Sequence, residues 1–346
     1  MTVTLGTRTI GAGRPAFLIA EAGVNHNGDV DLAHRLVAVA AAAGADAVKF
    51  QTFDPALLVA AGAAAAPYQR EATGTASQRA LLEGLSLPPG AWRELRDHAD
   101  DLGLVFLSTA FDLASADLLA DLGVPAFKVP SGELTNLPLI AALAGYGRPL
   151  LISTGMGTLA EVDAALQAAA AAPARVLFHC VSAYPTPVAD SNLRAIATMR
   201  ARFGVPVGWS DHTQGALTAT VAVALGASLI EKHVTLDRAL PGPDHAASED
   251  PDGLAAYVAA VRAAEAALGD GVKRPQPSEQ PNRVHARRSL HAARDLPAGA
   301  VLTGDDVVAL RPARGLSPAT EVTGLRLARP VAAGAVLTAD DVTGAG

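Results

Sequence analysis

The segment SLIEKHVT, residues 228–235, places three ionisable side chains in a row, Glu231, Lys232 and His233, inside an otherwise apolar run. A buried strand with such a row must pair its charges or use them for chemistry, because an unpaired buried charge is costly. Side chains two positions apart share one face of a strand. We therefore expect Glu231 and His233 to face one side, and Lys232 to face the other side and pair there with the covering helices.

A second apolar run, PVGWSDH at 206–212, ends with Ser210 and His212 on one shared face. On neighbouring strands, His212 and His233 are placed to hold one divalent metal ion, with carbonyl or water oxygens filling the rest of its coordination shell. The alternative for each histidine is a hydrogen-bonded core residue, because two histidines alone are a weak metal signal.

Lysine is scarce: only four of the 27 basic residues are Lys, and three of these lie in apolar runs, Lys49, Lys128 and Lys232. Lysine is a compact cation that suits a tight anion site, although a stem that reaches solvent from a strand end is the alternative. Hydroxyl side chains end other apolar runs. With Lys49 and Lys128 they form a set of donors suited to an anion that carries both phosphate and carboxylate. These hydroxyls belong to Thr109, Ser131, Ser153 and Ser210.

The elements that must position these residues follow an alternating pattern through residue 268. Short β-type apolar runs alternate with longer Ala- and Leu-rich stretches, which is typical of a parallel sheet with crossover helices. We expect strands at 17–23, 46–52, 104–110, 126–132, 149–155, 175–182, 206–212 and 228–234. We expect helices near 30–43, 90–102, 112–121, 137–144, 158–172, 191–203, 215–225 and 251–268. Eight such units in about 250 residues predict a (β/α)₈ TIM barrel, an α/β fold.

An open doubly wound sheet is the alternative fold, but EAGVNHNGD after the first strand lacks the spacing of a glycine-rich phosphate turn. A barrel gathers the C-terminal ends of its strands on one face, where its active site is built. The polar residues at the strand ends are therefore expected to converge there. The run from Thr52 to Pro88, with Pro67 and Tyr68, is too long for an ordinary connection and is interpreted as an insertion over the barrel mouth.

The composition shifts after Gly269. We expect a barrel domain at 1–269, a Pro- and Gln-rich linker at 270–286 and a small β-rich domain at 287–346. The last domain contains an internal repeat, because ARDLPAGAVLTGDDV (293–307) recurs as ARPVAAGAVLTADDV (328–342). Its core is small, so we expect it to lean on another surface.

Composition excludes several classes of protein. The net charge of −7 and the absence of a basic stripe argue against a nucleic-acid partner. No apolar run is long enough to span a membrane, and no secretory signal is visible at the N-terminus, so no membrane association and a cytoplasmic location are expected. The single cysteine, Cys180, excludes an internal disulfide and is expected to be a small core residue.

Motifs along nearly the whole chain resemble the sialic acid synthases, also called NeuB-like enzymes. They are AEAGVNHNGD, GADAVKFQT, FLSTAFD, FKVPSGELTN, LISTGMGT, CVSAYPTP, GWSDHT, EKHVTLDRALPGPDHAAS and RPARGLSP. The resemblance implies a transferase that condenses phosphoenolpyruvate with N-acetylmannosamine or a related acylated amino sugar. The C-terminal repeat is similar to the family's SAF, or antifreeze-like, domain, which implies a homodimer in which this domain reaches the partner's barrel.

The resemblance also implies roles for individual residues. The phosphoenolpyruvate-binding positions are Lys49, Thr109, Lys128, Ser131, Ser153 and Ser210. The sugar-binding positions are Glu21, Gln51, Tyr184, Asp244 and, from the SAF domain, Arg311. His212 and His233 match the ligands of a divalent metal, Mn²⁺ or Mg²⁺. The catalytic set is Glu21, Lys49, Lys128 and Glu133, the last matching a carboxylate proposed for proton handling.

Three alternatives stay open at this point. The first concerns the acceptor sugar, which is either N-acetylmannosamine or a di-acetamido hexose that leads to legionaminic or pseudaminic acid. A second alternative is another phosphoenolpyruvate-dependent aldol synthase that acts on a sugar phosphate, which would need a further phosphate-binding cluster. A third treats the barrel as a scaffold for an SAF domain that binds carbohydrate or ice.

Overall fold

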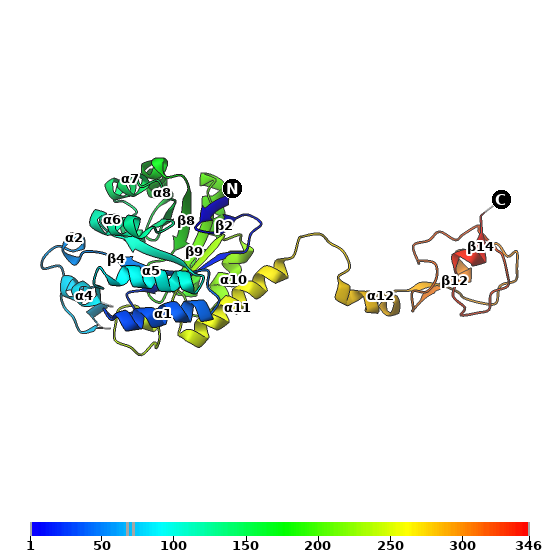
Figure 1. Ribbon diagram of the computed structural model, residues 1–346. Coiled ribbons are helices and arrows are strands. Elements are labelled where there is room, and N and C mark those ends of the chain that lie inside the picture. Colours follow the sequence, from blue (N-terminus) through cyan, green and yellow to red (C-terminus); the bar gives the residue numbers. More distant parts are fainter. Residues whose placement is uncertain (1, 67–68, 71–72, 345–346) are drawn as a thin grey trace. The chain divides into compact units, whose positions relative to one another are not determined.

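The computed structural model describes residues 2–66, 69–70 and 73–344. The chain divides into two compact units, Met1–Gly269 and Asp270–Gly346, and each is described by itself (Figure 1). No helix within the described ranges has the length and apolar character needed to cross a membrane.

The first unit is a closed barrel of eight parallel strands, so the predicted TIM barrel is confirmed and the open sheet is excluded. The strands follow one another around the barrel in the order β10-β3-β4-β5-β6-β7-β8-β9. Their bounds are β3 Phe17–Gly23, β4 Ala47–Thr52, β5 Val105–Ala110, β6 Phe127–Val129, β7 Leu150–Ser153, β8 Arg175–Cys180, β9 Val207–Asp211 and β10 Leu229–His233.

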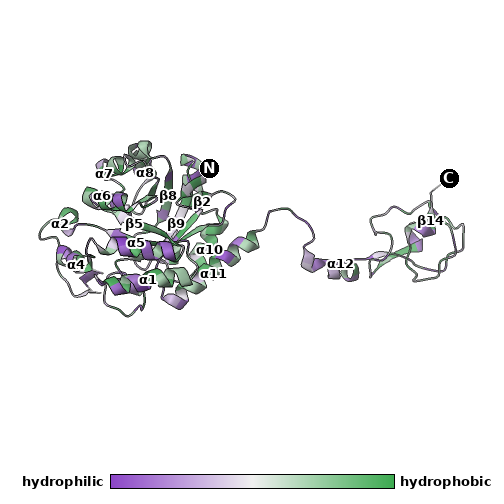
Figure 2. Cartoon of the chain, viewed as in Figure 1, coloured by the Kyte–Doolittle hydropathy of each residue, from purple (hydrophilic) through white to green (hydrophobic). Residues whose placement is uncertain are grey.

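A ring of helices covers the barrel, close to the predicted positions. They are α1 Val30–Ala42, α5 Ala91–Asp101, α6 Leu113–Leu122, α7 Leu137–Ala144, α8 Leu159–Ala168, α9 Arg194–Phe203, α10 Leu217–Ala224 and α11 Pro251–Leu268. Side-chain caps start several of them: Asp29 accepts from the amides of residues 31 and 32, and Thr158 forms a capping box with Glu161. Figure 2 shows the hydrophilic residues on α1 and α5, whereas Trp92 and Leu95 of α5 are buried.

An antiparallel hairpin that the sequence analysis did not predict precedes the barrel, β1 Thr2–Leu5 and β2 Arg8–Gly11. Its Val3, Leu5 and Ile10 are buried in one apolar cluster with Phe17 and other residues from the N-terminal halves of the strands. This packing closes the N-terminal end of the barrel with apolar side chains. The polar groups of the interior are therefore confined to the opposite end.

The long segment between β4 and α5 contains two short helices, α2 Pro55–Leu58 and α4 Gln78–Leu85. Arg79 of α4 donates to the backbone oxygens of Val59 and Ala56, which ties the two helices together. Pro67 and Tyr68, which the sequence analysis noted, lie outside the described residues.

The second unit contains a helix where the sequence predicted only a linker, α12 Gln280–Ala286. Pro281 occupies its first turn, where proline needs no amide partner, so a proline-rich segment still supports a helix here. Two small antiparallel pairs follow. They are β11 Ser289–Ala292 with β12 Val307–Leu310, and β13 Arg326–Leu327 with β14 Val342–Thr343.

The sequence repeat folds into two copies of one turn. Thr303 forms a capping box with Asp306, and Thr338 forms the same box with Asp341. Asp306 pairs with Arg294 in the first copy, and Asp341 pairs with an arginine at the matching position of the second. Both aspartates are buried although the unit is small. We infer that these hydrogen-bonded turns supply part of the stability that its small core cannot.

Thr338→Ala removes the hydroxyl of the second turn and is expected to lower the free energy of unfolding of the C-terminal unit by about 1 kcal/mol. Hydrogen exchange of peptides that cover residues 326–343 measures this loss in the full chain. Thr320→Ala, whose side chain takes part in no such box, serves as the control. Equal exchange in the two variants would contradict the structural role of the repeat.

Candidate functional site

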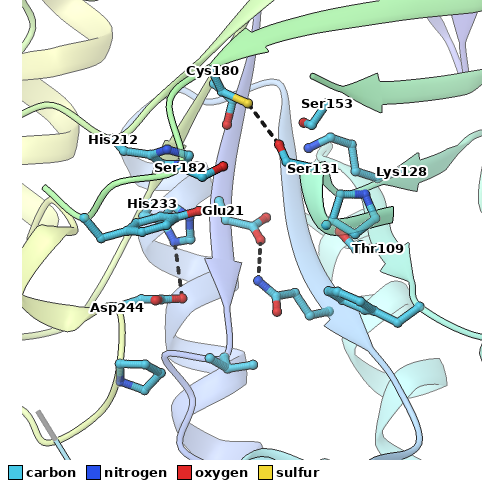
Figure 3. A pocket seen from close by; sticks show the side chains of 18 of the residues that line it. Glu21, Thr109, Lys128, Ser131, Ser153, Cys180, Ser182, His212, His233 and Asp244 are labelled. Atoms are coloured by element: carbon cyan, nitrogen blue, oxygen red, sulfur yellow. Dashed lines mark hydrogen bonds and ion pairs between the residues drawn. The ribbon is translucent and has the colours of Figure 1, made fainter. Parts of the chain in front are cut away.

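A cavity of about 580 Å³ opens at the C-terminal ends of the strands. It gathers every predicted site residue except two, and Figure 3 shows several of them around Glu21. The predicted residues that line it are Glu21, Lys49, Gln51, Thr109, Lys128, Ser131, Ser153, Tyr184, Ser210, His212, His233 and Asp244. Side chains from all eight strands and their following loops therefore meet in one place.

Two predicted residues lie elsewhere. Glu133 lines an adjoining cavity and accepts a 2.7 Å hydrogen bond from the side-chain amide of Asn136. Arg311 belongs to the C-terminal unit, between β12 and β13, and is not among the residues that line the cavity.

Glu231 occupies the centre of the site, although the sequence analysis gave it no role in the chemistry. Both of its carboxylate oxygens lie 3.0 Å from Lys128 Nζ, and Ser210 Oγ donates to it at 2.8 Å. Lys49 Nζ is 3.6 Å away. The alternation of faces along β10 pointed to this position. The sequence alone could not show that two lysines from other strands converge on Glu231.

Lys49 is held from a second side. Its ammonium lies 2.7 Å from Glu21 Oε2 and donates to Thr109 Oγ1 at 3.1 Å. Gln51 donates to the other oxygen of Glu21 at 3.3 Å. Glu21, Lys49, Lys128 and Glu231 thus form a group of two cations and two anions, which we call the charge cluster, and each member is at most 3% exposed.

Burial and ion pairing shift the pKa values of the groups in the charge cluster in different directions. Burial raises the pKa of Glu21 to about 7 despite its ion pair with Lys49. Burial opposes the charge on Glu231 too, but Lys128 and Lys49 outweigh it and hold the pKa of Glu231 below its usual range. Burial lowers the pKa of Lys128, whereas the two carboxylates beside Lys49 outweigh burial and raise the pKa of Lys49. Glu21 is therefore the member that exchanges a proton near neutral pH.

The two histidines lie together, with ring centroids 5.5 Å apart. His212 Nδ1 donates to the Val181 carbonyl at 2.7 Å, which leaves its Nε2 lone pair available. His233 Nδ1 is buried with no hydrogen-bond partner among the described residues, and Asp244 Oδ2 lies 3.8 Å from it. Burial lowers the pKa of both rings, so both are neutral at pH 7.

Two neutral imidazoles with free nitrogens fit the donor set of a divalent metal ion. Within the part of the chain that the structure describes, no group of three or more His, Cys, Asp or Glu side chains is arranged to hold a metal. A metal bound here would therefore take its remaining ligands from carbonyl oxygens, water or a substrate.

Ser131 lies in a corner rich in hydrogen-bond donors. Its Oγ accepts from the Gly155 amide at 3.0 Å and is 3.1 Å from Cys180 Sγ. A Cβ at Gly155 would lie 2.4 Å from Ser182 Oγ and 2.8 Å from Ser131 Oγ, so any residue other than glycine would displace these hydroxyls. Cys180 was expected to be a plain core residue. It is buried, but it lines the cavity, and burial raises the pKa of its thiol.

Lys232 faces away from the cavity, as predicted. Its ammonium lies 3.6 Å from Glu249 Oε1, 3.8 Å from Asp211 Oδ2 and 5.2 Å from the ring centre of Tyr257. It also donates to the Thr213 carbonyl. The three ionisable groups in SLIEKHVT thus serve two sites, with Glu231 and His233 inside the barrel and Lys232 between the strands and their helices.

Glu231→Gln leaves Lys49 and Lys128 close together without their shared carboxylate. We expect a loss of about 3–5 kcal/mol in the free energy of unfolding of the barrel. Urea denaturation followed by tryptophan fluorescence measures it, because both tryptophans, Trp92 and Trp209, lie in the barrel unit. Adding Lys128→Met should restore part of the loss.

The surface substitution Glu94→Gln is the matched control, since Glu94 is exposed on α5 and should change stability by less than about 0.5 kcal/mol. If Glu231→Gln lowers the free energy of unfolding no more than this control does, the ion pairs of the charge cluster do not stabilise the barrel.

Family models match two parts of the chain. A model of the NeuB family matches residues 36–273, and a model of the SAF domain matches residues 287–343. The chain is 44% identical over 321 residues to N,N'-diacetyllegionaminic acid synthase of Legionella pneumophila, which covers 91% of this chain and 90% of that protein. It is 42% identical over 309 residues to N,N'-diacetyllegionaminic acid synthase of Campylobacter jejuni, with coverage of 88% and 92%.

Among solved structures, the chain is similar to the N-acetylneuraminic acid (sialic acid) synthetase of Leptospira borgpetersenii in complex with citrate. The TM-score is 0.73 at 34% identity, and the match covers 82% of this chain and 95% of that one. The family match spans most of the barrel, and the relatives match over about nine-tenths of the chain. The chain therefore belongs to the NeuB family, and its C-terminal unit carries an SAF domain.

Proposed function

We propose that this NeuB-family chain condenses phosphoenolpyruvate with the open-chain aldehyde of an N-acylated amino sugar, giving a nonulosonic acid and phosphate. One observation carries the proposal: two buried lysines and a set of hydroxyls share a single cavity with two neutral histidines. The lysines suit the anion, and the histidines suit a metal ion beside the acceptor.

Phosphoenolpyruvate carries a phosphate and a carboxylate, and both need cations and hydrogen-bond donors. Lys49 and Lys128 supply the cations, and each is already held in place by a carboxylate. The hydroxyls proposed to complete the anion site are those of Thr109, Ser131, Ser153 and Ser210. Donors fixed before binding need little rearrangement when the phosphate departs, which favours its release as an anion.

His212 and His233 are the residues that would hold a divalent ion, Mn²⁺ or Mg²⁺. Bound there, the metal would supply a positive charge that polarises the aldehyde oxygen of the acceptor. The chain's own contribution is to keep both imidazoles neutral and to orient His212 through the Val181 carbonyl.

In the proposed reaction, the methylene carbon of phosphoenolpyruvate attacks the aldehyde carbon, and the aldehyde oxygen gains a proton and becomes a hydroxyl. Water adds to the cationic enol-ether carbon and loses a proton, and the tetrahedral intermediate expels phosphate to leave a 2-keto acid. Glu21, with a pKa of about 7, suits one of these proton transfers. Glu133 remains a further candidate for proton handling, from the adjoining cavity.

We place the acceptor sugar against Glu21, Gln51, Tyr184 and Asp244. Arg311 is proposed to reach it from the SAF domain of a second copy, in a homodimer.

The rival reaction, with a sugar phosphate as acceptor, needs a second phosphate site. Lys49 and Lys128 are the only lysines or arginines among the described residues that line the cavity, and the charge cluster engages both. A cytoplasmic location remains part of the proposal.

Release of phosphate tests the reaction. Wild-type protein with phosphoenolpyruvate, Mn²⁺ and an N-acylated mannosamine should release phosphate, and omission of any one of the three should abolish the release. His233→Ala should lower kcat by at least about 100-fold, and His212→Ala and His233→Ala should each weaken Mn²⁺ binding, read from the Mn²⁺ resonance signal, on the order of tenfold or more.

His34→Ala, on α1 outside the cavity, is the control and should change neither quantity. Full activity without metal, or unchanged Mn²⁺ binding in both cavity variants, would remove the histidine site from the proposal.

Mixed dimers test the proposed role of Arg311. Arg311→Ala and His233→Ala should each be nearly inactive alone. If Arg311 serves the partner's barrel, a mixed dimer contains one intact site, so mixing the two variants under exchanging conditions should restore part of the activity. No recovery, with heterodimers verified by mass, would mean that Arg311 does not act across subunits.

A further inference from the structure

The side of the histidine pair that faces away from the cavity is built around one buried cation. Lys232 directly precedes His233 on β10, and only 1% of its surface is exposed. It is not among the described residues that line the cavity, and no step of the proposed reaction uses it. A buried ammonium is costly unless it is paired, so the contacts of Lys232 indicate what it holds together.

The backbone pairing between β9 and β10 ends one residue before the histidines. Its last pair joins Asp211 to Lys232, and His212 is the first residue beyond β9. His233 instead pairs with Glu21 of β3, on the other side of β10. The backbone pairing of β9 with β10 therefore does not fix the distance between the two imidazoles.

Lys232 joins the two strands beyond this point. Its ammonium lies 3.8 Å from Asp211 Oδ2 and donates to the carbonyl of Thr213, so it contacts the residues on both sides of His212. Asp211 Oδ1 accepts from the amide and from the hydroxyl of Thr213, both at 2.8 Å, which bends the chain at His212. A side chain next to the second histidine thus holds the turn that carries the first.

Glu249, in the loop before α11, connects the same cation to the backbone of His233. Its Oε1 lies 3.6 Å from Lys232 Nζ and accepts from the Gly215 amide at 3.1 Å. Its own backbone amide donates to the His233 carbonyl at 2.9 Å. Lys232 is therefore the group through which the segments that carry the two histidines are linked on this side of the barrel.

Tyr257 of α11 contacts the same network without joining the two strands. Its hydroxyl donates to Asp211 Oδ2 at 2.8 Å, and Thr218 donates to the same oxygen at 3.0 Å. Both hydrogen bonds stabilise Asp211, but neither reaches β10. The ring of Tyr257 lies 5.2 Å from Lys232 Nζ, a contact that phenylalanine would keep.

We propose that Lys232 is a positioning residue that sets the distance between the imidazoles of His212 and His233. Ligands that are held in place before binding give a tighter metal site, and groups behind metal ligands commonly change metal affinity by about 10–100-fold. The inference rests on the proposed function, because it takes the two histidines as the metal ligands.

Lys232→Met keeps most of the bulk of the side chain and removes its ammonium. Titration of metal-free protein with Mn²⁺, read from the Mn²⁺ resonance signal, should show an affinity about tenfold or more below that of the wild type. Pulsed resonance of the bound Mn²⁺ should show nitrogen couplings from both imidazoles in the wild type and from only one in the variant.

Two further variants separate a loss of position from a loss of stability. Tyr257→Phe should lower the melting temperature but leave the Mn²⁺ affinity and both nitrogen couplings unchanged. Lys232→Met combined with Glu249→Gln also removes a carboxylate that has lost its cation, so its melting temperature should recover towards the wild-type value. Its Mn²⁺ affinity should stay low, because the link between the strands is still missing.

Wild-type Mn²⁺ affinity with both nitrogen couplings, in a folded Lys232→Met or in the double variant, would overturn the inference and leave the proposed function standing. An equal loss of affinity in Tyr257→Phe would also overturn it, since affinity would then follow stability. Mn²⁺ bound to the wild type without any imidazole coupling would overturn the metal site of the proposed function, and the inference with it.

Discussion

The contact on which the site depends is that of Glu231 with two lysines brought from different strands. Two ammonium groups buried in one cavity would repel each other and lose their protons without a carboxylate between them. Glu231 holds Lys128 directly and Lys49 more distantly, and Glu21 holds Lys49 from its other side. Because the four charges balance, the barrel can keep two cations away from water and ready for an anion.

This arrangement requires that the strands do not slip. Register places Glu21 beside Lys49, Thr109 beside Lys128 and Ser210 beside Glu231, and a shift of one residue would turn each side chain to the opposite face. Apolar side chains of the N-terminal hairpin, β1 and β2, fill the other end of the barrel. On the outer face, the buried contacts of Lys232 with Asp211 and Glu249 fix β9 and β10, which carry the two histidines.

Much of this was accessible from the sequence because its signals are periodic. Alternation along β10 placed His233 inside and Lys232 outside, and the repeated change from apolar to polar residues identified the barrel and its open end. The role of Glu231 was not accessible, since it depends on which strands lie opposite one another across the barrel. Side-chain alternation places Glu231 on a face but says nothing about two lysines that lie more than a hundred residues away.

Features without a periodic signal were also missed. The short hairpin at residues 2–11 has too few alternating positions to stand out, and the prolines around α12 suggested a linker. Gln78 belongs to an insertion that sequence reasoning could locate over the mouth but could not fold. Its place among the residues that line the cavity comes from the packing of α4, held by Arg79 against α2.

The central claim is that an arriving anion shares the lysines with carboxylates that are already present, and proton exchange tests it most directly. Added negative charge beside Glu21 should raise its pKa above about 7, so phosphoenolpyruvate should bind with net uptake of protons at pH 8, where its phosphate is already ionised. Calorimetry of metal-free protein in buffers of different ionisation enthalpy measures this uptake. The account predicts up to about one proton per site in the wild type and none in Glu21→Gln; binding without uptake in the wild type would contradict it.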